Sequence, residues 1–232
     1  MKRLPKINQV NSDTFNLSIS DLMAGLLAIF VLVLCYFILN FNQATSQLNQ
    51  NNLKRAAILM EIQEEMRKNG FEVKIDTEHG ILHIPEGVLF DIGEADISKD
   101  EGKKIVEKLS MIMSDVLSSE EYYGSVETVF IEGHTDNIPI KNNKFPSNWE
   151  LSTKRAINTW LTMQHSQSSL NTLMNKNNQP IFSCSGYADT RPVADNSTDQ
   201  GRKENRRIDI RFSMSSPNQE DQELVKFVKS RM

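Results

Sequence analysis

The sequence predicts an α+β protein with a single N-terminal transmembrane helix, a connector helix and a two-layer α/β sandwich built on a mixed sheet. Two observations predict this fold class. One long uncharged apolar run lies near the N-terminus, and the polar remainder contains strands and helices in the order ββαβαβ and then β. This order places the helices on one face of the sheet. The 232 residues, 24% of them charged, suit one folded domain with attachments.

The apolar run from Leu22 to Leu39 carries no charge. A helix from 17 to 39 would reach about 34 Å, which exceeds the roughly 30 Å of a bilayer's hydrocarbon core. Basic residues precede the run, so we expect residues 1–16 to form a cytoplasmic tail, 17–41 to span the membrane and the rest to be periplasmic. The alternative is a cleaved signal peptide, whose apolar region is usually only about 7–15 residues long. We therefore favour a retained single-pass anchor.

Asp21 stands at the head of this run. An ionised side chain costs at least about 2.5 kcal/mol at the bilayer centre and less near its edge, so carboxylates inside membranes are candidates for function. The alternative is that Ser20 and Asp21 cap the helix at the membrane interface. Position alone leaves both interpretations open.

Residues 42–70 are expected to form a periplasmic linker and connector. The stretch 42–52 is rich in Asn and Gln, while 53–68 has apolar residues at approximately helical spacing and is followed by Asn69-Gly70. The helix could be a solvated connector or a short dimer stalk.

The folded domain is expected over 71–213, with a polar tail over 214–232. Alternating or clustered apolar residues predict strands and broad apolar faces predict helices. The expected elements are a hairpin of 71–75 and 81–84, a helix over 103–117, a strand over 128–131, a helix over 149–163, strands over 180–185 and 207–212, and a weak terminal helix over 220–231.

Charge and cysteine content exclude several functions. The net charge is −4, so the chain has no basic face for nucleic acid. Cys35 lies in the predicted span and Cys184 in a predicted strand, so they cannot bridge within one chain. No Cys or His pair has metal-ligand spacing, and we expect neither a metal site nor a cofactor.

Two linked tracts carry the recognisable chemistry. One is Ile131-Glu-Gly-His-Thr-Asp136 with Ser147-Asn-Trp-Glu-Leu-Ser-Thr-Lys-Arg-Ala156. The other is Gly186-Tyr-Ala-Asp-Thr-Arg-Pro192 with Gly201-Arg-Lys-Glu-Asn-Arg-Arg-Ile208. A strand that ends near Asp136 and a helix that carries Arg155 can share a rim. An arginine can donate two parallel hydrogen bonds to a carboxylate while an aspartate binds an ammonium, so the pair could bind a zwitterion. A structural Asp–Arg bridge is the alternative.

These tracts resemble the OmpA-like peptidoglycan-binding domain, and 147–156 is similar to its flagellar stator (MotB-type) branch. The resemblance covers roughly 85–213 and includes Leu89-Phe-Asp-Ile-Gly-Glu-Ala-Asp96. It implies that Asp136 and Arg155 hold the diaminopimelate of the stem peptide, supported by Asn148 and Leu151. Pro139 stands where outer-membrane members usually have glycine, so the rim follows the stator form.

The resemblance also argues against catalysis. His134 is the one candidate for a general base, but no Ser or Cys nucleophile with a supporting carboxylate accompanies it, and the matching histidine in the family is structural. The resemblance gives Arg206 a role in bracing a loop. We do not expect an enzyme.

A single span, one membrane carboxylate and this domain together resemble the B subunit of a rotary stator in the bacterial inner membrane. The resemblance implies a homodimer inside a pentameric ring of multi-span A subunits, with Asp21 carrying the translocated ion. A lone carboxyl makes H⁺ the simpler expectation, and Na⁺ is the alternative. The cytoplasmic N-terminus and periplasmic domain fit this arrangement.

Within this superfamily, Ser18-Ile-Ser-Asp-Leu-Met-Ala-Gly-Leu-Leu27 is most similar to the B subunit of the Zorya anti-phage defence system. A flagellar MotB subunit is the nearest alternative and shares the mechanism. A passive peptidoglycan-tethering membrane protein without ion flux is the alternative from another class.

Overall fold

The computed structural model describes residues 9–91, 93–140 and 142–215. Its contacts divide the chain into two compact units, Met1–Asn49 and Gln50–Met232. The helix α1 (Gln9–Lys68) contributes to both units. Within it, Ser20–Asn42 is long and apolar enough to cross a membrane, by length and composition alone. The predicted span over 17–41 agrees with this segment to within a few residues.

The stretch 42–52, expected to be a linker, is part of the helix α1. Asn and Gln lower helix propensity by less than about 0.7 kcal/mol per residue, and no Gly or Pro interrupts the chain from 42 to 69. Gly70 has a φ of +84° and ends the helix. The amide of Phe71 then donates to the carbonyl of Met66 over 3.0 Å, as in a glycine C-cap.

The end of α1 belongs to the core of the second unit. Ile58, Leu59, Ile62 and Met66 are fully buried and join the main hydrophobic cluster. The interpretation of 53–68 as a solvated connector or dimer stalk is therefore corrected, because its apolar face covers part of the folded domain. The folded unit begins at Gln50 by its contacts, not at the expected residue 71.

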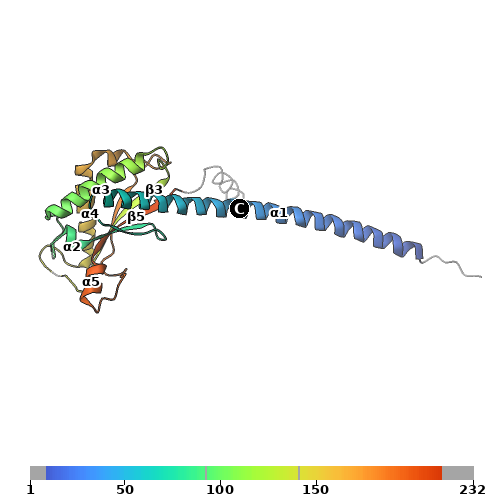
Figure 1. The fold of residues 1–232 in the computed structure, drawn as a ribbon. Helices are drawn as coiled ribbons and strands as arrows, with labels where there is room; N and C mark the ends of the chain where they lie inside the picture. The colour runs from blue at the N-terminus through green and yellow to red at the C-terminus, as the bar shows by residue number, and fades with distance from the viewer. Residues whose placement is uncertain (1–8, 92, 141, 216–232) are drawn as a thin grey trace, which may run out of the picture. The chain divides into compact units, whose positions relative to one another are not determined.

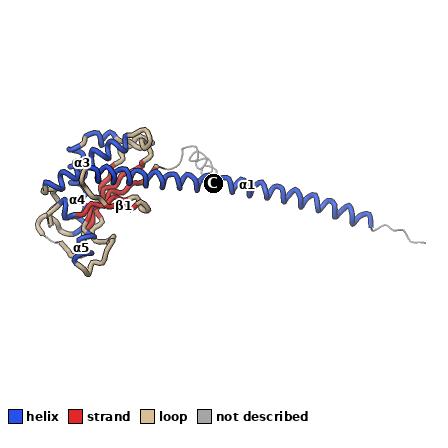
Figure 2. Tube along the Cα trace, in the orientation of Figure 1, coloured by secondary structure: helices blue, strands red, loops and turns tan. Residues whose placement is uncertain are grey.

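The sheet has five strands, drawn in red in Figure 2, in the order β1-β2-β5-β3-β4. Their bounds are Lys74–Asp76, Ile81–Pro85, Arg207–Met214, Val126–His134 and Phe182–Gly186 in that spatial order. Among the described strands only β3 and β4 pair in parallel, whereas the other pairs are antiparallel. The expected mixed sheet is confirmed.

Two long helices, α3 (Asp100–Ser118) and α4 (Asn148–Ser166), supply the helical layer (Figure 1). The helix α4 packs on β3 and β4 and contacts α3. The apolar residues of β3 and β5 beneath the helices are fully or almost fully buried, among them Val129, Ile131, Ile208, Ile210 and Phe212. This core holds fixed the strand ends and the helix start from which the candidate site is built.

Three short elements lie outside the predicted set. They are α2 (Glu86–Leu89), the 3-10 helix η1 (Ser168–Thr172) and α5 (Asp199–Asn205). All three have fewer than eight residues, which is too short for an apolar period to be recognised. The strand β1 is also shorter than the expected 71–75. The expected terminal helix over 220–231 lies outside the described residues.

Candidate ligand-binding site

A cavity of about 300 Å³ contains all four residues predicted to bind ligand. The carboxyl end of β3, the start of α4, the start of α2 and the end of α5 meet there. Its lining consists of Glu86, Gly93, Thr135, Asp136, Ile138, Pro139, Ile140, Asn148, Leu151, Arg155 and Arg206. The expectation that strand end and helix share a rim is therefore confirmed geometrically.

Asp136 stands two residues after the end of β3 and is almost fully buried. The amide of Thr135 donates to the carbonyl of Ala188 over 2.8 Å, which fixes the turn. One carboxylate oxygen of Asp136 accepts a 3.0 Å hydrogen bond from the amide of Ile138. The other contacts Nη1 of Arg206 in an ion pair. The carboxylate therefore faces the cavity with a cation already beside it.

Asn148 is the first residue of α4, after Ser147, whose hydroxyl caps the helix by accepting from the amide of Trp149. Its Oδ1 accepts from the amide of Ile140 over 3.0 Å, and its Nδ2 lies 3.1 Å from the carbonyl of Ile138. The side chain thus fixes the shape of the loop after Asp136. Leu151, one turn further, is buried against Ala95 and Phe145.

Arg155 is 2% exposed and is the largest fully buried side chain among the described residues. Its Nε donates to the carbonyl of Glu94 over 2.8 Å, and its guanidinium carbon lies 5.1 Å from the centre of the Phe90 ring. Its Nη1 lies 2.7 Å from Oε2 of Glu86. Burial lowers the pKa of Arg155, and the Glu86 charge opposes that shift.

Glu86 is the site residue that the sequence did not single out. It begins α2, is 5% exposed and lies between two cations, with Nε of Arg206 3.6 Å from Oε2. The 2.7 Å contact with Arg155 is an ion pair without hydrogen-bond geometry. Burial raises the pKa of Glu86, while the charges of Arg155 and Arg206 act in the opposite direction.

The cavity therefore holds two carboxylates and two guanidinium groups that neutralise each other. Arg155 pairs with Glu86, and Arg206 pairs with Asp136. A ligand that carries one carboxylate and one ammonium can enter without changing the net charge of the buried site. It exchanges partners with the existing pairs and leaves no ion uncompensated, which matters because an unpaired buried charge is costly.

A family model described as the OmpA family matches residues 89–206, which is more than half of the chain. The chain belongs to the OmpA family. Motility protein B of Bacillus subtilis (strain 168) is 31% identical over 149 residues, covering 64% of this chain and 51% of that protein. The chain spans about half the length of this relative and of a second curated relative from the same organism. The name of this relative, a motility protein, describes no enzymatic activity and agrees with the expectation that the chain is not an enzyme.

Solved structures support the fold of this OmpA domain. The periplasmic domain of Helicobacter pylori MotB (residues 78–256) is 23% identical with a TM-score of 0.50, over 64% of this chain and 85% of that one. A MotB-like protein of Desulfovibrio vulgaris is 18% identical with a TM-score of 0.53, over 74% of this chain and 98% of that one. Identities this low establish the shared architecture alone.

Two glycines bring α4 close to the sheet of the OmpA domain. Gly133 of β3 and Gly186 of β4 are register partners. A Cβ added to Gly133 would collide with the backbone carbonyl of Ser152, and one added to Gly186 would collide with Thr153. Glycine at both positions lets the helix approach closely enough to place Arg155 over the end of β3.

Asp21 lies in the interior of α1, because the helix begins at Gln9. The alternative interpretation of Asp21 as an N-terminal helix cap is therefore corrected, since a cap residue stands at the helix start. The Ser20–Asn42 segment around it has no residue buried by the rest of the described structure. Asp21 belongs to this segment and takes no part in the cavity of the OmpA domain.

Glu132, His134 and Asp209 form a buried cluster close enough to hold a metal ion. Arg211 pairs with Glu132, however, and Arg207 pairs with Asp209 over 3.0 Å. These two guanidinium groups already neutralise the carboxylates, so the donor set does not fit a cation. His134 stacks on Tyr187, with ring centres 5.4 Å apart, and its Nε2 lies 3.3 Å from Asp209, contacts that suit a structural residue.

Proposed function

We propose that the cavity of the OmpA domain binds the stem peptide of peptidoglycan through its zwitterionic diaminopimelate. The observation that carries this proposal is the paired arrangement of Arg155 with Glu86 and of Arg206 with Asp136 in one cavity. Diaminopimelate presents an ammonium and a carboxylate on a single carbon, which matches two adjacent sites of opposite charge. The OmpA-family membership supports the same ligand.

The binding step is an exchange of ionic partners. The ligand carboxylate approaches the guanidinium groups of Arg155 and Arg206, and its ammonium approaches Asp136. Arg155 keeps its orientation during this exchange, because its Nε stays bonded to the Glu94 carbonyl. Asn148 contributes by holding the loop that carries Asp136, since its own amide group is occupied by that loop.

The test is co-sedimentation of the full chain, in detergent, with purified sacculi. We expect Arg155→Ala and Asp136→Asn to lose binding, whereas Arg191→Ala retains it, because Arg191 contacts Tyr187 outside the cavity. Circular dichroism confirms that each variant is folded. Undiminished pelleting of a folded Asp136→Asn protein would refute the assignment.

We further propose that the chain is the inner-membrane B subunit of an ion-driven stator, tethered to the wall by this domain. A homodimer would sit inside a pentameric ring of multi-span A subunits, with its N-terminus in the cytoplasm and its OmpA domain in the periplasm. Asp21 would carry the ion, with H⁺ expected over Na⁺. Ala24, Gly25 and Ala28 allow close helix approach nearby.

The energetics suit this role. Each unit charge that crosses the membrane releases about 2.3 kcal/mol per 100 mV. The wall tether supplies the fixed point against which a partner ring can turn. On the resemblance of residues 18–27 to the Zorya branch, we propose anti-phage defence as the process that the motor serves. The relatives named motility protein B make flagellar rotation the competing assignment.

The decisive variant is Asp21→Asn, co-expressed with the partner A subunit, with Asp21→Glu as the carboxyl-retaining control. We expect Asp21→Asn to abolish ion flux and phage protection, and Asp21→Glu to keep part of both. Loss of swimming with unchanged phage sensitivity would assign the motor to motility. Unchanged flux and protection in Asp21→Asn would leave only a passive wall tether.

A further inference from the structure

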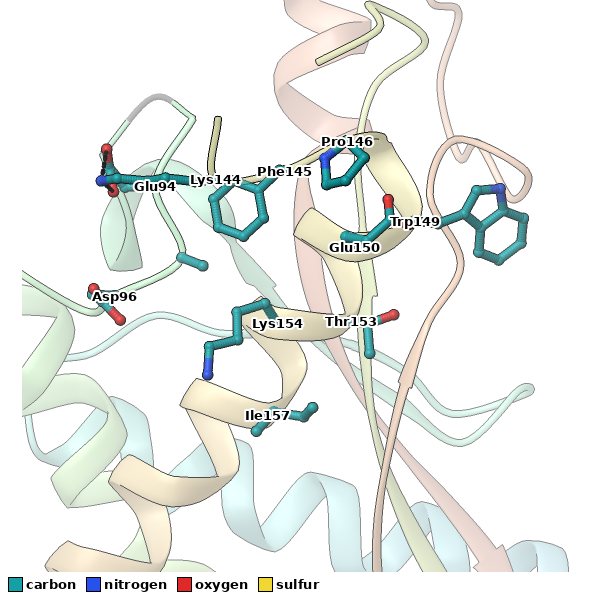
Figure 3. A pocket seen from close by; sticks show the side chains of 11 residues that line it. Glu94, Asp96, Lys144, Phe145, Pro146, Trp149, Glu150, Thr153, Lys154 and Ile157 are labelled. Atoms are coloured by element: carbon teal, nitrogen blue, oxygen red, sulfur yellow. Dashed lines mark hydrogen bonds and ion pairs between the residues drawn. The ribbon is translucent and has the colours of Figure 1, made fainter. Parts of the chain in front are cut away.

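A second, larger pocket lies beside the cavity, on the neighbouring face of α4 (Figure 3). Its volume of about 580 Å³ falls within the roughly 300–1,000 Å³ of ordinary ligand pockets. It is lined by Glu94, Ala95, Asp96, Lys144, Phe145, Pro146, Trp149, Glu150, Thr153, Lys154 and Ile157. None of these residues belongs to the lining of the first cavity.

The chain segment 93–96, which we call the strap, separates the two pockets. Gly93 lines the cavity, whereas residues 94–96 line the larger pocket. Arg155 holds the strap through the carbonyl of Glu94. One turn along α4, Asn158 donates to the carbonyl of Ala95 over 2.9 Å and to Asp96 over 2.8 Å. A group bound in either pocket therefore contacts the same short segment.

The helix α4 presents different residues to the two pockets. Leu151 and Arg155 face the cavity, while Lys154 and Ile157 line the larger pocket. Ala95, Phe145 and Leu151 pack together between them. A ligand in the cavity and a second group attached to it by a short link can occupy both sides of this partition.

The lining of the larger pocket combines apolar surface with hydrogen-bonding groups. Figure 3 shows Phe145 and Pro146 at the start of α4 and Ile157 further along, with the Trp149 indole pointing away from Phe145. Asp96, Glu150 and Lys154 stand around this apolar surface. Pyranose rings have apolar C–H faces and a rim of hydroxyl groups, so they match such a lining.

Charge narrows the choice of ligand. Lys144 pairs with Glu94, with Nζ 2.9 and 2.8 Å from the two carboxylate oxygens. The remaining charges are Asp96, Glu150 and Lys154, which do not attract a polyanion such as a phosphodiester chain. A neutral, hydroxyl-rich ligand is the best match.

We propose that this pocket is a saccharide subsite for the N-acetylated hexosamine strand to which the stem peptide is attached. This inference rests on the proposed function of the cavity, because the strap makes the two pockets neighbours on one polymer. The peptide enters the cavity and the sugar next to it lies on the Phe145, Pro146 and Ile157 surface. The two contacts together then hold the wall more tightly than the peptide alone.

The experiment uses calorimetric titration of the full chain in a detergent without a sugar head group. The probes are a free stem peptide, the same peptide on its disaccharide, and glycan strands stripped of peptide. For the wild type we expect the disaccharide-peptide to bind at least about tenfold more tightly than the peptide, as for two linked contacts. The variant Ile157→Asp should lose this gain but keep its affinity for the peptide.

Met111→Asp is the matched control, because Met111 is an exposed apolar residue of α3 outside the lining of this pocket. Lys154→Glu, at an exposed position, provides a second variant if Ile157→Asp fails to fold, and we expect it to reduce the gain at least threefold. Saturation-transfer NMR should show sugar protons in contact with the wild type. Equal affinities for the two peptide probes, or a gain that survives in folded variants of both positions, would overturn the subsite.

The two proposals fail separately. Peptide binding without a saccharide gain would refute the subsite and leave the cavity assignment intact. Binding of stripped glycan strands without peptide binding would refute the cavity assignment while supporting a saccharide site. Binding of neither probe would overturn both.

Discussion

Arg155 and Glu86 form an ion pair inside the OmpA domain, with Nη1 2.7 Å from Oε2 and both side chains almost fully buried. The pair joins α4 to α2 across the floor of the candidate cavity. Burying two charges together is roughly neutral for stability, but removing one partner is costly. The pair therefore fixes the orientation of Arg155, the proposed ligand-binding arginine, more than it stabilises the fold.

Glu86→Gln should lower the free energy of unfolding by about 3–5 kcal/mol, because it leaves the Arg155 charge uncompensated. Urea unfolding of the full chain measures this change. The control is Glu94→Gln, which breaks the exposed Lys144 pair and should cost no more than about 1 kcal/mol. Equal costs for the two variants would show that burial of Glu86 does not matter.

The cavity illustrates what a sequence can predict. Two motifs at short spacing contain all four predicted residues, Asp136, Asn148, Leu151 and Arg155. The sequence predicts that one motif ends a strand and the other begins a helix, which is enough to expect these residues close together. Glu86 lies in a four-residue helix and contacts Arg155 only because the sheet folds that segment under α4. Such a contact between distant segments leaves no local pattern.

The order of the strands in the sheet also depends on contacts between segments that are distant in the sequence. The alternating residues of β5 mark a strand, but its insertion between β2 and β3 depends on packing across the whole domain. The apolar spacing of 53–68 likewise predicts a helix, but it does not predict which surface of the domain that helix covers. Local periodicity predicts elements, and long-range packing decides their neighbours.

Ile62→Ala tests whether the end of α1 is part of the core. Ile62 is fully buried in the main cluster, so its truncation should cost about 2–5 kcal/mol of unfolding free energy. Met60→Ala is the matched control on the same helix, because Met60 is 56% exposed and should change stability little. Thermal unfolding distinguishes the two, and a harmless Ile62→Ala would restore the solvated-connector interpretation.

Gly133→Ala tests the close approach of α4 to the sheet. The added Cβ meets the backbone of Ser152, which cannot move as a side chain can, so we expect a loss of about 1–3 kcal/mol. Binding to sacculi should also weaken, since the displaced helix carries Arg155. Gly87→Ala is the control, because nothing lies within 4 Å of a Cβ at that position. If both variants behave like the wild type, the approach does not constrain the site.

Asp209 should control the stability of the domain at acid pH. Burial alone would raise the pKa of Asp209, but the close contact with His134, the hydrogen bond with His83 and the charge of Arg207 outweigh it. They hold the pKa well below its ordinary value of about 3.8. A lowered folded-state pKa means that the ionised form stabilises the folded protein above about pH 4, and that this contribution is lost as the pH falls.

Asp209→Asn should therefore lower the free energy of unfolding at pH 7 by about 3–5 kcal/mol, because Arg207 loses its buried partner. The same variant should flatten the fall in stability between about pH 5 and pH 2, since the titrating group is gone. Urea unfolding across that range measures both effects. Asp195→Asn is the control: the Ser197 hydrogen bonds also lower the pKa of Asp195, but the carboxylate is exposed. If the fall in stability at acid pH is the same in Asp209→Asn as in the wild type, other carboxylates govern acid unfolding.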